Sequence, residues 1–275
     1  MTGPFRSTKS YKMKIGIALS GGGARGVAHL GMLKALEEMG IQPRMITGSS
    51  AGAIVGAFYA YGYPPSEILA IISKAKLFRI LRPSFNWKGL LTLEKTYEFF
   101  KSFLPADSFE TLKLPLYVCT THIKNGRPAF FSTGELIRPI IASSAIPVLF
   151  TPVKIGEEHF IDGGIVNNLP VEPLVGHCDK ILGLHCNPID ENFQAGNMKN
   201  LLERTFILAI SRNITQRKQE CDVFLEPYEL RKFGALEFSG LKEIFDIGYN
   251  YAKKESAHIE NILNQQNRKG MSDSR

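Results

Sequence analysis

Short apolar runs alternate along this chain with longer segments whose apolar residues recur at helical spacing. Residues 13–19 and 180–185 are runs typical of buried strands, whereas residues 27–39 have the leucine and alanine spacing of an amphipathic helix. Strands that alternate with helices usually form a mainly parallel sheet with helices on both faces. The pattern therefore predicts an α/β fold with a mainly parallel central sheet.

The remaining predicted elements continue this alternation, with glycine and proline at the breaks between them. Further strands are predicted at residues 44–47, 116–120, 129–131 and 222–226. Further helices are predicted at residues 51–61, 67–75, 135–142, 201–217 and 241–264. We expect Ser66 to cap the helix at 67–75, and Pro139 to kink or end the helix at 135–142.

The length and composition of the chain suit one large domain. Of its 275 residues, 44% are hydrophobic and 21% are charged, which is enough for a substantial core. The polar segments at 1–11 and 265–275 are predicted to be disordered, and residues 12–264 are predicted to form a single α/β domain. The sequence shows neither a signal peptide nor an apolar run long enough to span a bilayer, so a cytoplasmic protein is expected.

Two glycine loops carry the candidate chemistry, and each follows a predicted strand and precedes a predicted helix. The second loop, Gly48-Ser49-Ser50-Ala51-Gly52, has the small residues that a nucleophile elbow needs, because this sharp turn crowds the backbone around the serine. Ser50 would lie at a helix N-terminus, which favours negative charge nearby. The same residues would also suit a flexible turn in which a serine caps the helix.

The first loop places Gly21, Gly23 and Gly26 in a G-x-G-x-x-G pattern, whose backbone N–H groups are suited to an anion. A dinucleotide site would need an acidic residue at the end of the second strand, and none is present there. A P-loop would need a following Gly-Lys-Ser/Thr sequence, which is also missing. Beside a nucleophilic serine, the remaining anion-binding loop would serve as an oxyanion hole.

The order of these motifs resembles that of the patatin-like phospholipases. Residues 19–31 are similar to the opening motif of that family, residues 48–52 to its nucleophile motif, and Asp162-Gly163-Gly164 to its Asp-Gly-Gly element. Residues 142–147 resemble another recurring segment of the family. The resemblance covers a motif core at 12–170 and implies a three-layer α/β/α fold. The helices and strand at 198–264 resemble those of small bacterial members and are expected to belong to the same domain.

The resemblance also implies roles for individual residues. Ser50 would attack the ester carbonyl and Asp162 would accept the serine proton, and a partly desolvated site would raise the pKa of Asp162 and improve it as a base. The oxyanion hole would lie in the loop formed by Gly21, Gly22, Gly23, Ala24, Arg25 and Gly26, with the N–H groups of Gly22 and Gly23 as donors. The glycines that would support these motifs are Gly48, Gly52, Gly163 and Gly164. Arg25 would add to the hole, bind a phosphate or form a salt bridge that holds the loop.

Six histidines compete with Asp162 for the role of general base. His29 follows the first glycine loop on a predicted helix, where we expect it to pack or to hydrogen-bond. His159 lies close to Asp162 in the sequence, and His185 ends a predicted strand, so both remain candidates for a Ser–His triad.

No metal or cofactor is expected. The sequence has no H-E-x-x-H motif, no calcium-binding loop and no Cys/His cluster with ligand spacing. Its four cysteines form no C-x-x-C pair and are expected to be free thiols in a reducing compartment.

The net charge of +7 would suit contact with an anionic lipid surface or with nucleic acid. No nucleic-acid-binding motif accompanies this charge, so a nucleic-acid partner is not expected. Residues 76–103 mix aromatic and cationic side chains, as an interfacial segment does, which allows peripheral membrane contact. A core-packed helix and loop with solvated charges would explain the same residues. The sequence does not predict an oligomeric state.

Together these observations predict a serine acyl hydrolase that cleaves fatty-acyl esters, with a lipid or another acyl ester as substrate. One alternative is a carboxylesterase or thioesterase that acts on soluble acyl esters. Another is a non-catalytic module that binds lipid or an anion. The presence of both Ser50 and Asp162 weighs against this last possibility, because a binding module needs neither.

Overall fold

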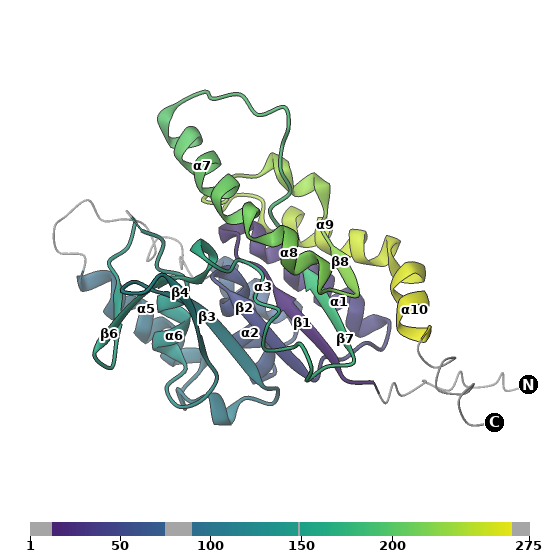
Figure 1. Ribbon diagram of the computed structural model, residues 1–275, viewed down its shortest axis with the longest axis horizontal. Coiled ribbons are helices and arrows are strands. Elements are labelled where there is room, and N and C mark those ends of the chain that lie inside the picture. Colours follow the sequence, from purple (N-terminus) through teal and green to yellow (C-terminus); the bar gives the residue numbers. More distant parts are fainter. Residues whose placement is uncertain (1–12, 75–89, 148, 266–275) are drawn as a thin grey trace, which may run out of the picture.

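Eight strands form one sheet in the computed structural model, which describes residues 13–74, 90–147 and 149–265 (Figure 1). The strands are β1 (Ile15–Leu19), β2 (Met45–Ser49), β3 (Leu116–His122), β4 (Arg127–Phe131), β5 (Val153–Ile155), β6 (Glu158–Asp162), β7 (Lys180–Leu184) and β8 (Val223–Leu225). The helices in these ranges are α1 (Ala28–Glu38), α2 (Ala51–Tyr61), α3 (Pro65–Lys74), α5 (Leu90–Phe103), α6 (Ile137–Ser143), α7 (Met198–Arg212), α8 (Ile214–Gln219), α9 (Leu241–Lys254) and α10 (Ser256–Asn264).

The strand order is β5-β6-β3-β2-β1-β7-β8, with β4 paired to β3 outside this path. Strands β3, β2, β1, β7 and β8 run parallel, whereas β4, β5 and β6 are antiparallel to their neighbours. The predicted mainly parallel sheet is therefore confirmed. Strands β1 and β2 are parallel, and Leu19 near the end of β1 pairs with Gly48 near the end of β2. The two glycine loops therefore lie side by side at the carboxyl ends of these strands.

Strands β2 and β6 follow one another along a single edge of β3. Ser49 of β2 pairs with Cys119, and Asp162 of β6 pairs with the next residue, Thr120. Strand β4 pairs with residues 118–122, which overlaps both partners, so β4 occupies the opposite edge. Since β6 runs antiparallel to β3, its last residue meets the last residue of β2. This junction brings Asp162 to the nucleophile loop.

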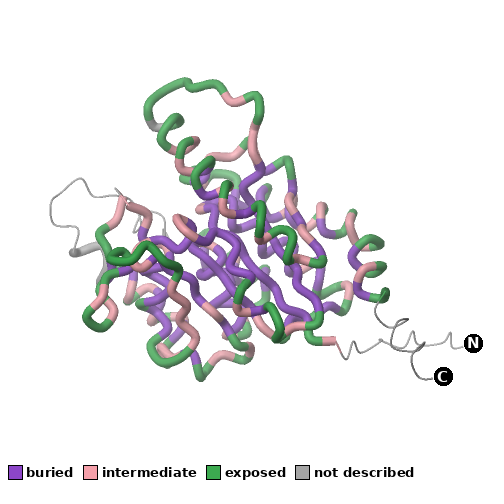
Figure 2. The backbone as a smooth tube through the Cα atoms, viewed as in Figure 1, coloured by how far each residue is buried: buried purple, intermediate pink, exposed green. Residues whose placement is uncertain are grey.

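The two faces of the sheet are covered by layers of unequal size. Ile15, Ile17 and Leu19 of β1 belong to a large core that includes residues from α1, α2, α3, α5, α6, α9 and α10. Ala18 points to the opposite face, as alternation along a strand requires. The smaller core on that face consists of Ala18, Leu169, Val171, Leu174, Ile181 and Ile214. Figure 2 shows that the central strands are buried between these two layers.

Tertiary contacts divide two helices that the sequence pattern predicts as continuous. The predicted helix at 201–217 is α7 and α8, which meet at Asn213, and the predicted helix at 241–264 is α9 and α10, which meet at Glu255. At the first junction the Asn213 side chain accepts a hydrogen bond from the N–H of Asn168 and donates one to the carbonyl of Gly164. These contacts anchor the junction to the loop that follows Asp162.

Proline explains two further differences from the predicted helices. Helix α3 begins at Pro65, a favoured first position, so Ser66 lies inside the helix and does not cap it. Pro139 is in the first turn of α6, where its missing N–H breaks no intrahelical hydrogen bond, so it neither kinks nor ends the helix. The short strands β5 and β6 were not predicted, because the polar pair Glu158 and His159 interrupts their apolar pattern.

Several expectations concern residues outside the described ranges. They include the segment at 1–11 and nearly all of the segment at 265–275, both predicted to be disordered, and most of the predicted interfacial segment at 76–103, whose described part is α5. None of the helices in the described ranges has the length and apolar character needed to cross a lipid bilayer.

Candidate active site

Ser50 lies at a sharp turn between β2 and α2, and its backbone has φ 52° and ψ −122°. A positive φ is unfavourable for a non-glycine residue and persists only where the surrounding structure imposes it. The flanking glycines make this turn possible. A Cβ at Gly48 would lie 2.5 Å from the backbone of Gly52, and a Cβ at Gly52 would lie 2.3 Å from the carbonyl oxygen of Leu19. The residues at 48–52 therefore have the backbone geometry of a nucleophile elbow.

Ser143, the last residue of α6, holds this turn in place through its side-chain hydroxyl. The N–H of Ser50 donates a hydrogen bond of 2.8 Å to Ser143 Oγ, and the same hydroxyl donates one of 2.6 Å to the carbonyl of Cys119 on β3. Both hydrogen bonds are buried. No role was predicted for Ser143. It belongs to the segment at 142–147 that resembles a recurring segment of the family, and this resemblance is the sequence feature that could have identified it.

Asp162 is the hydrogen-bond partner of the Ser50 side chain. Ser50 Oγ donates to Asp162 Oδ2 over 2.7 Å, and the N–H of Gly164 donates to Asp162 Oδ1 over 2.7 Å. Asp162 is only 1% exposed, and burial raises the pKa of its carboxyl to about 7, although the hydrogen bonds from Ser50 and Gly164 act in the opposite direction. A carboxyl with this pKa can both accept and return a proton near neutral pH.

The glycines after Asp162 allow close contact with the elbow. A Cβ at Gly163 would lie 2.2 Å from the carbonyl oxygen of Cys119, and a Cβ at Gly164 would lie 2.9 Å from Asp162 Oδ1. Any side chain at either position would displace the Asp162 carboxylate or the backbone that supports it.

The first glycine loop lies against Ser50 and offers two free backbone donors. A Cβ at Gly21 would be 2.9 Å from Ser50 Cβ, and a Cβ at Gly26 would be 2.5 Å from Ala51 Cβ. Other N–H groups of the loop are occupied, because Gly21 donates to Asn168, Ala24 to Ala235 and Arg25 to Gly22. Within the described residues, the N–H groups of Gly22 and Gly23 have no hydrogen-bond partner.

Buried polar side chains hold this loop from behind. Asn187 Nδ2 donates to the carbonyl of Gly21 over 2.6 Å, and Cys186 Sγ lies 3.3 Å from the same oxygen. Ser20 Oγ accepts from the N–H of Cys186 over 3.2 Å. The support from Cys186 and Asn187 was not predicted, because these residues follow β7 and reach the loop only through the pairing of β7 with β1.

Arg25 links the glycine loop to the segment that precedes α9. Its Nε donates to the carbonyl of Phe233 over 2.7 Å, and burial lowers the pKa of its guanidinium. Arg25 is 8% exposed, and its buried Nη1 has no partner among the described residues. Of the roles expected for Arg25, loop anchoring is thus carried by a hydrogen bond to a main-chain carbonyl.

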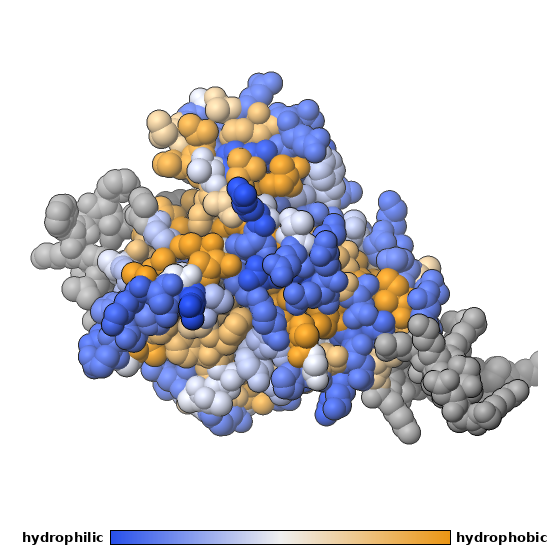
Figure 3. Space-filling view, viewed as in Figure 1, coloured by the Kyte–Doolittle hydropathy of each residue, from blue (hydrophilic) through white to orange (hydrophobic). Residues whose placement is uncertain are grey.

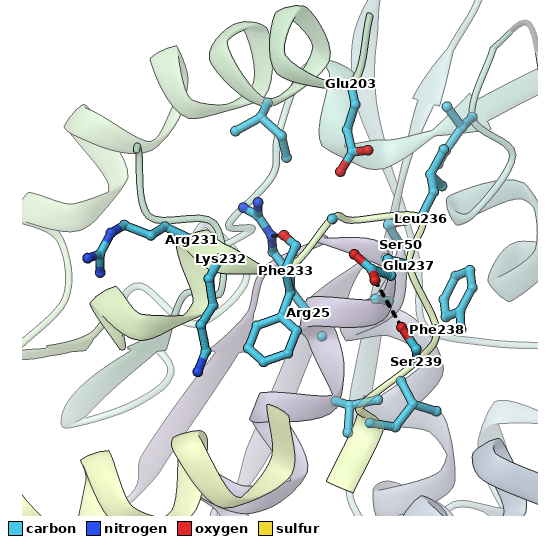
Figure 4. Close-up of a pocket in the computed structure, with 18 of the residues that line it drawn as sticks. Arg25, Ser50, Glu203, Arg231, Lys232, Phe233, Leu236, Glu237, Phe238 and Ser239 are labelled. Atoms are coloured by element: carbon cyan, nitrogen blue, oxygen red, sulfur yellow. Dashed lines mark hydrogen bonds between the residues drawn. The ribbon is translucent and has the colours of Figure 1, made fainter. Parts of the chain in front are cut away.

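A cavity of about 1270 Å³ has Ser50 and Gly23 in its wall. Figure 4 shows Arg25, Glu203 and Glu237 around the space beside Ser50, with Lys232 farther away beyond Phe233. The charged residues of its wall are Arg25, Asp190, Glu203, Arg204, Arg231, Lys232 and Glu237. The apolar residues of its wall include Ile54, Val55, Ile146, Leu149, Phe150, Phe193, Ile207 and Leu241. The cavity therefore combines an apolar lining with a charged region, as a site for an amphiphile would.

The histidines with described contacts are engaged elsewhere. His29 is buried, its Nε2 lies 2.8 Å from the carbonyl oxygen of Ser20, and burial lowers its pKa to about 4. His185 Nδ1 lies 2.6 Å from Glu226 Oε1, and His159 is exposed on β6. Among the described residues that line the cavity there is no histidine. His29 thus makes the expected hydrogen bond, and the geometry gives no support to a Ser–His triad.

In the described part of the chain, no group of three or more His, Cys, Asp or Glu residues is placed to hold a metal ion. The four cysteines are free thiols. Cys119 and Cys186 are buried, and burial raises the pKa of both.

Comparisons with known proteins show what the chain as a whole is similar to. The family model described as "Patatin-like phospholipase" matches residues 17–175. The chain is 29% identical over 289 residues to lysophospholipase nte1 of Aspergillus terreus, an alignment that covers 91% of this chain and 18% of that protein. It is 33% identical over 169 residues to an uncharacterized NTE family protein of Mycobacterium tuberculosis, which covers 61% of this chain and 47% of that protein. The chain thus spans about a fifth of the length of its fungal relative.

The structure is also similar to that of VipD from Legionella pneumophila. The TM-score is 0.54 at 15% sequence identity, and the match covers 92% of this chain and 67% of that chain. At this identity the similarity concerns the fold, and it agrees with the α/β fold expected from the sequence.

Proposed function

The chain belongs to the patatin-like phospholipase family, and from this premise we propose that it is a serine acyl hydrolase that cleaves fatty-acyl esters of phospholipids or lysophospholipids. The observation that carries the proposal is the 2.7 Å hydrogen bond from Ser50 Oγ to Asp162 Oδ2 at the wall of a largely apolar cavity. A hydroxyl in this position needs only a base and an oxyanion hole to act as a nucleophile.

In the proposed first half-reaction, Asp162 Oδ2 takes the proton of Ser50 Oγ while Oγ attacks the ester carbonyl carbon. The carbonyl oxygen becomes an oxyanion, the bond to the leaving alcohol breaks, and Asp162 returns the proton to that alcohol. In the second half-reaction water attacks the acyl–Ser50 ester, Asp162 takes a proton from the water, and Ser50 regains a proton as the fatty acid leaves. The pKa of about 7 suits Asp162 to both transfers.

The proposed oxyanion hole consists of the N–H groups of Gly22 and Gly23. Both are free of other hydrogen bonds in the described structure, whereas the N–H groups of Gly21, Ala24 and Arg25 are occupied. Donors that are already oriented cost no reorganisation when charge develops, and each is typically worth ~2.7–4 kcal/mol in the transition state. The contacts of Asn187 and Cys186 with Gly21 hold the loop in this orientation.

The cavity supports an amphiphilic substrate. Its apolar wall can hold an acyl chain, and the guanidinium of Arg25, which lines the cavity, would bind a phosphate oxygen. A small soluble ester would use only part of this volume. A phospholipid or lysophospholipid uses both the apolar wall and the cationic group.

The test compares wild type, Ser50→Ala and Asp162→Asn in hydrolysis of lysophospholipid, phospholipid vesicles and p-nitrophenyl esters, with fluorophosphonate labelling of the serine. We expect wild type to be labelled and active, Ser50→Ala to be unlabelled, and both variants to lose hydrolysis. Faster turnover of soluble esters than of any lipid would favour a carboxylesterase or thioesterase. If wild type is neither labelled nor able to hydrolyse any of these substrates, the result would favour a non-catalytic module.

A further inference from the structure

Helix α7 has two apolar faces, and only one of them is covered. Ile207 and Ile210 are buried in a small core with Ala235, and Glu203 and Arg204 on the same helix line the cavity. Other large apolar side chains of α7 are exposed: Met198 by 68%, Leu201 by 43%, Leu202 by 62% and Leu208 by 47%. Helix α7 is therefore both a wall of the proposed active site and an apolar surface.

The four exposed side chains form one stripe. Residues three, four and seven positions apart lie on the same side of a helix, which places Met198 beside Leu201 and Leu202 and places Leu208 two turns beyond Leu201. Figure 1 shows α7 at the margin of the molecule, and Figure 3 shows apolar surface gathered over it. We call these four residues the α7 stripe.

Exposed large apolar residues are concentrated near the cavity. Within the described residues the others are Ile123, Val175, Tyr228 and Leu236. Leu236 lines the cavity, and Tyr228 lies in the same segment that precedes α9. Contiguous exposed apolar surface of this kind usually marks a binding site.

Basic residues outnumber acidic residues in α7 and α8. Helices α7 and α8 together contain five basic residues and one acidic residue in sequence, and the chain as a whole carries a net charge of +7. The acidic residue, Glu203, and one of the basic residues, Arg204, both line the cavity, and Glu203 accepts a hydrogen bond from the N–H of Ala235. Asp190 and Glu191 precede α7, and Asp190 also lines the cavity.

We propose that the α7 stripe docks on an anionic lipid bilayer and places the cavity against the membrane surface. The proposal rests on the proposed function, because a lipid acyl chain must leave the bilayer to reach Ser50. Apolar side chains flanked by cationic groups are the composition of interfacial helices. A second copy of the chain is a poorer occupant, because two copies of this surface would bring like charges together.

The test measures vesicle binding in a Ser50→Ala background, so that hydrolysis cannot change the vesicles. The variant is Met198→Gln with Leu202→Gln, which removes the two most exposed members of the α7 stripe and keeps good helix formers. The matched control is Val175→Gln, which removes another exposed apolar side chain (49% exposed) that does not line the cavity. Leu202→Trp is a gain-of-binding variant, since tryptophan favours the membrane interface.

With vesicles of phosphatidylcholine mixed with phosphatidylserine, we expect the double variant to bind roughly tenfold more weakly and Val175→Gln to bind like the parent. Leu202→Trp should bind more tightly, and binding should weaken with salt and on phosphatidylcholine alone. Equal binding by the parent and the double variant would overturn the proposal. So would a concentration-dependent dimer of the parent that the double variant abolishes, because the α7 stripe would then be a contact between copies.

Failure of this proposal is separable from failure of the proposed function. In the wild-type Ser50 background, the double variant should keep fluorophosphonate labelling and hydrolysis of a soluble p-nitrophenyl ester, and should lose only activity on vesicles. If soluble-ester hydrolysis is absent in every protein while vesicle binding still depends on the α7 stripe, the docking surface stands and the hydrolase assignment fails.

Discussion

The N–H of Ser50 donates a 2.8 Å hydrogen bond to Ser143 Oγ, and this bond holds a backbone that has a positive φ. Ser143 in turn donates to the carbonyl of Cys119, so one hydroxyl joins the elbow to α6 and β3. It also occupies the N–H of Ser50 itself. The proposed oxyanion donors lie in the other glycine loop, where the N–H groups of Gly22 and Gly23 have no partner among the described residues.

Replacing Ser143 with alanine should therefore damage both stability and catalysis. The change leaves a buried N–H and a buried carbonyl without their partner, which typically costs ~1–3 kcal/mol, and it releases the strained turn. We expect lower thermal stability and a kcat on a soluble ester that is roughly tenfold lower or more. Ser211→Ala, which removes a hydroxyl bonded to a carbonyl within α7, is the control and should keep its activity. Full activity of Ser143→Ala would show that the turn is held without this bond.

The pH dependence of hydrolysis should report the ionisation of Asp162. The carboxylate form is the base, and burial raises the pKa of this carboxyl to about 7, so kcat/KM should rise with pH and level off above that value. Asp162→Asn should lower kcat about 10²–10⁴-fold and remove this ascending limb from the residual activity. A wild-type profile that is flat from about pH 5 to pH 8 would contradict the proposed base.

The same carboxyl should make the folded protein less stable at alkaline pH. Its pKa is near 7 when folded and 3.8 in its ordinary state, so its contribution to stability is full below the lower value and is lost as the pH rises through the higher one. The Asp162→Asn variant has no ionisable carboxyl at this position, so it does not lose this contribution to stability as the pH rises. Its Tm relative to wild type should therefore increase between about pH 5 and pH 8. Ser50→Ala keeps the buried carboxyl and removes a hydrogen bond that lowers its pKa, so it should lose stability with rising pH at least as much as wild type does.

Alanine at Gly23 should disrupt the oxyanion loop. A Cβ there would lie 2.1 Å from the carbonyl oxygen of Ala235, and Gly23 also has a φ of +56°. We expect displacement of the Gly23 N–H and a kcat about 10²–10³-fold lower. Gly40→Ala is the matched control, because Gly40 has a φ of +76° with no atom near the added Cβ. It should lose stability and keep its activity, which separates backbone strain from the clash at the loop.

Arg25→Lys tests whether the guanidinium binds a phosphate. Lysine keeps the charge but cannot both donate to the carbonyl of Phe233 and present a second N–H to a ligand. We expect kcat/KM for a lysophospholipid to fall roughly tenfold more than kcat/KM for an uncharged p-nitrophenyl ester. Equal losses on both substrates would limit Arg25 to anchoring the loop.

Local sequence determined much of this site, because the requirements of a sharp turn are local. The spacing of Gly48, Ser50 and Gly52 predicts the elbow, and the apolar run after it predicts α2 with the bounds that the structure shows. The parallel sheet also follows from the alternation of elements along the chain. Asp162 was identified only by motif resemblance, since an Asp-Gly pair by itself predicts no more than a turn.

Tertiary structure decided which groups meet Ser50 and what each can do there. Asp162 reaches Ser50 because β6 and β2 share one edge of β3, and burial at that junction raises its pKa. The free donors of the glycine loop and the support from Ser143 depend on contacts between segments that are distant in the sequence. Periodicity alone could not show which apolar face of α7 would be covered, because that depends on how the helix packs against its neighbours.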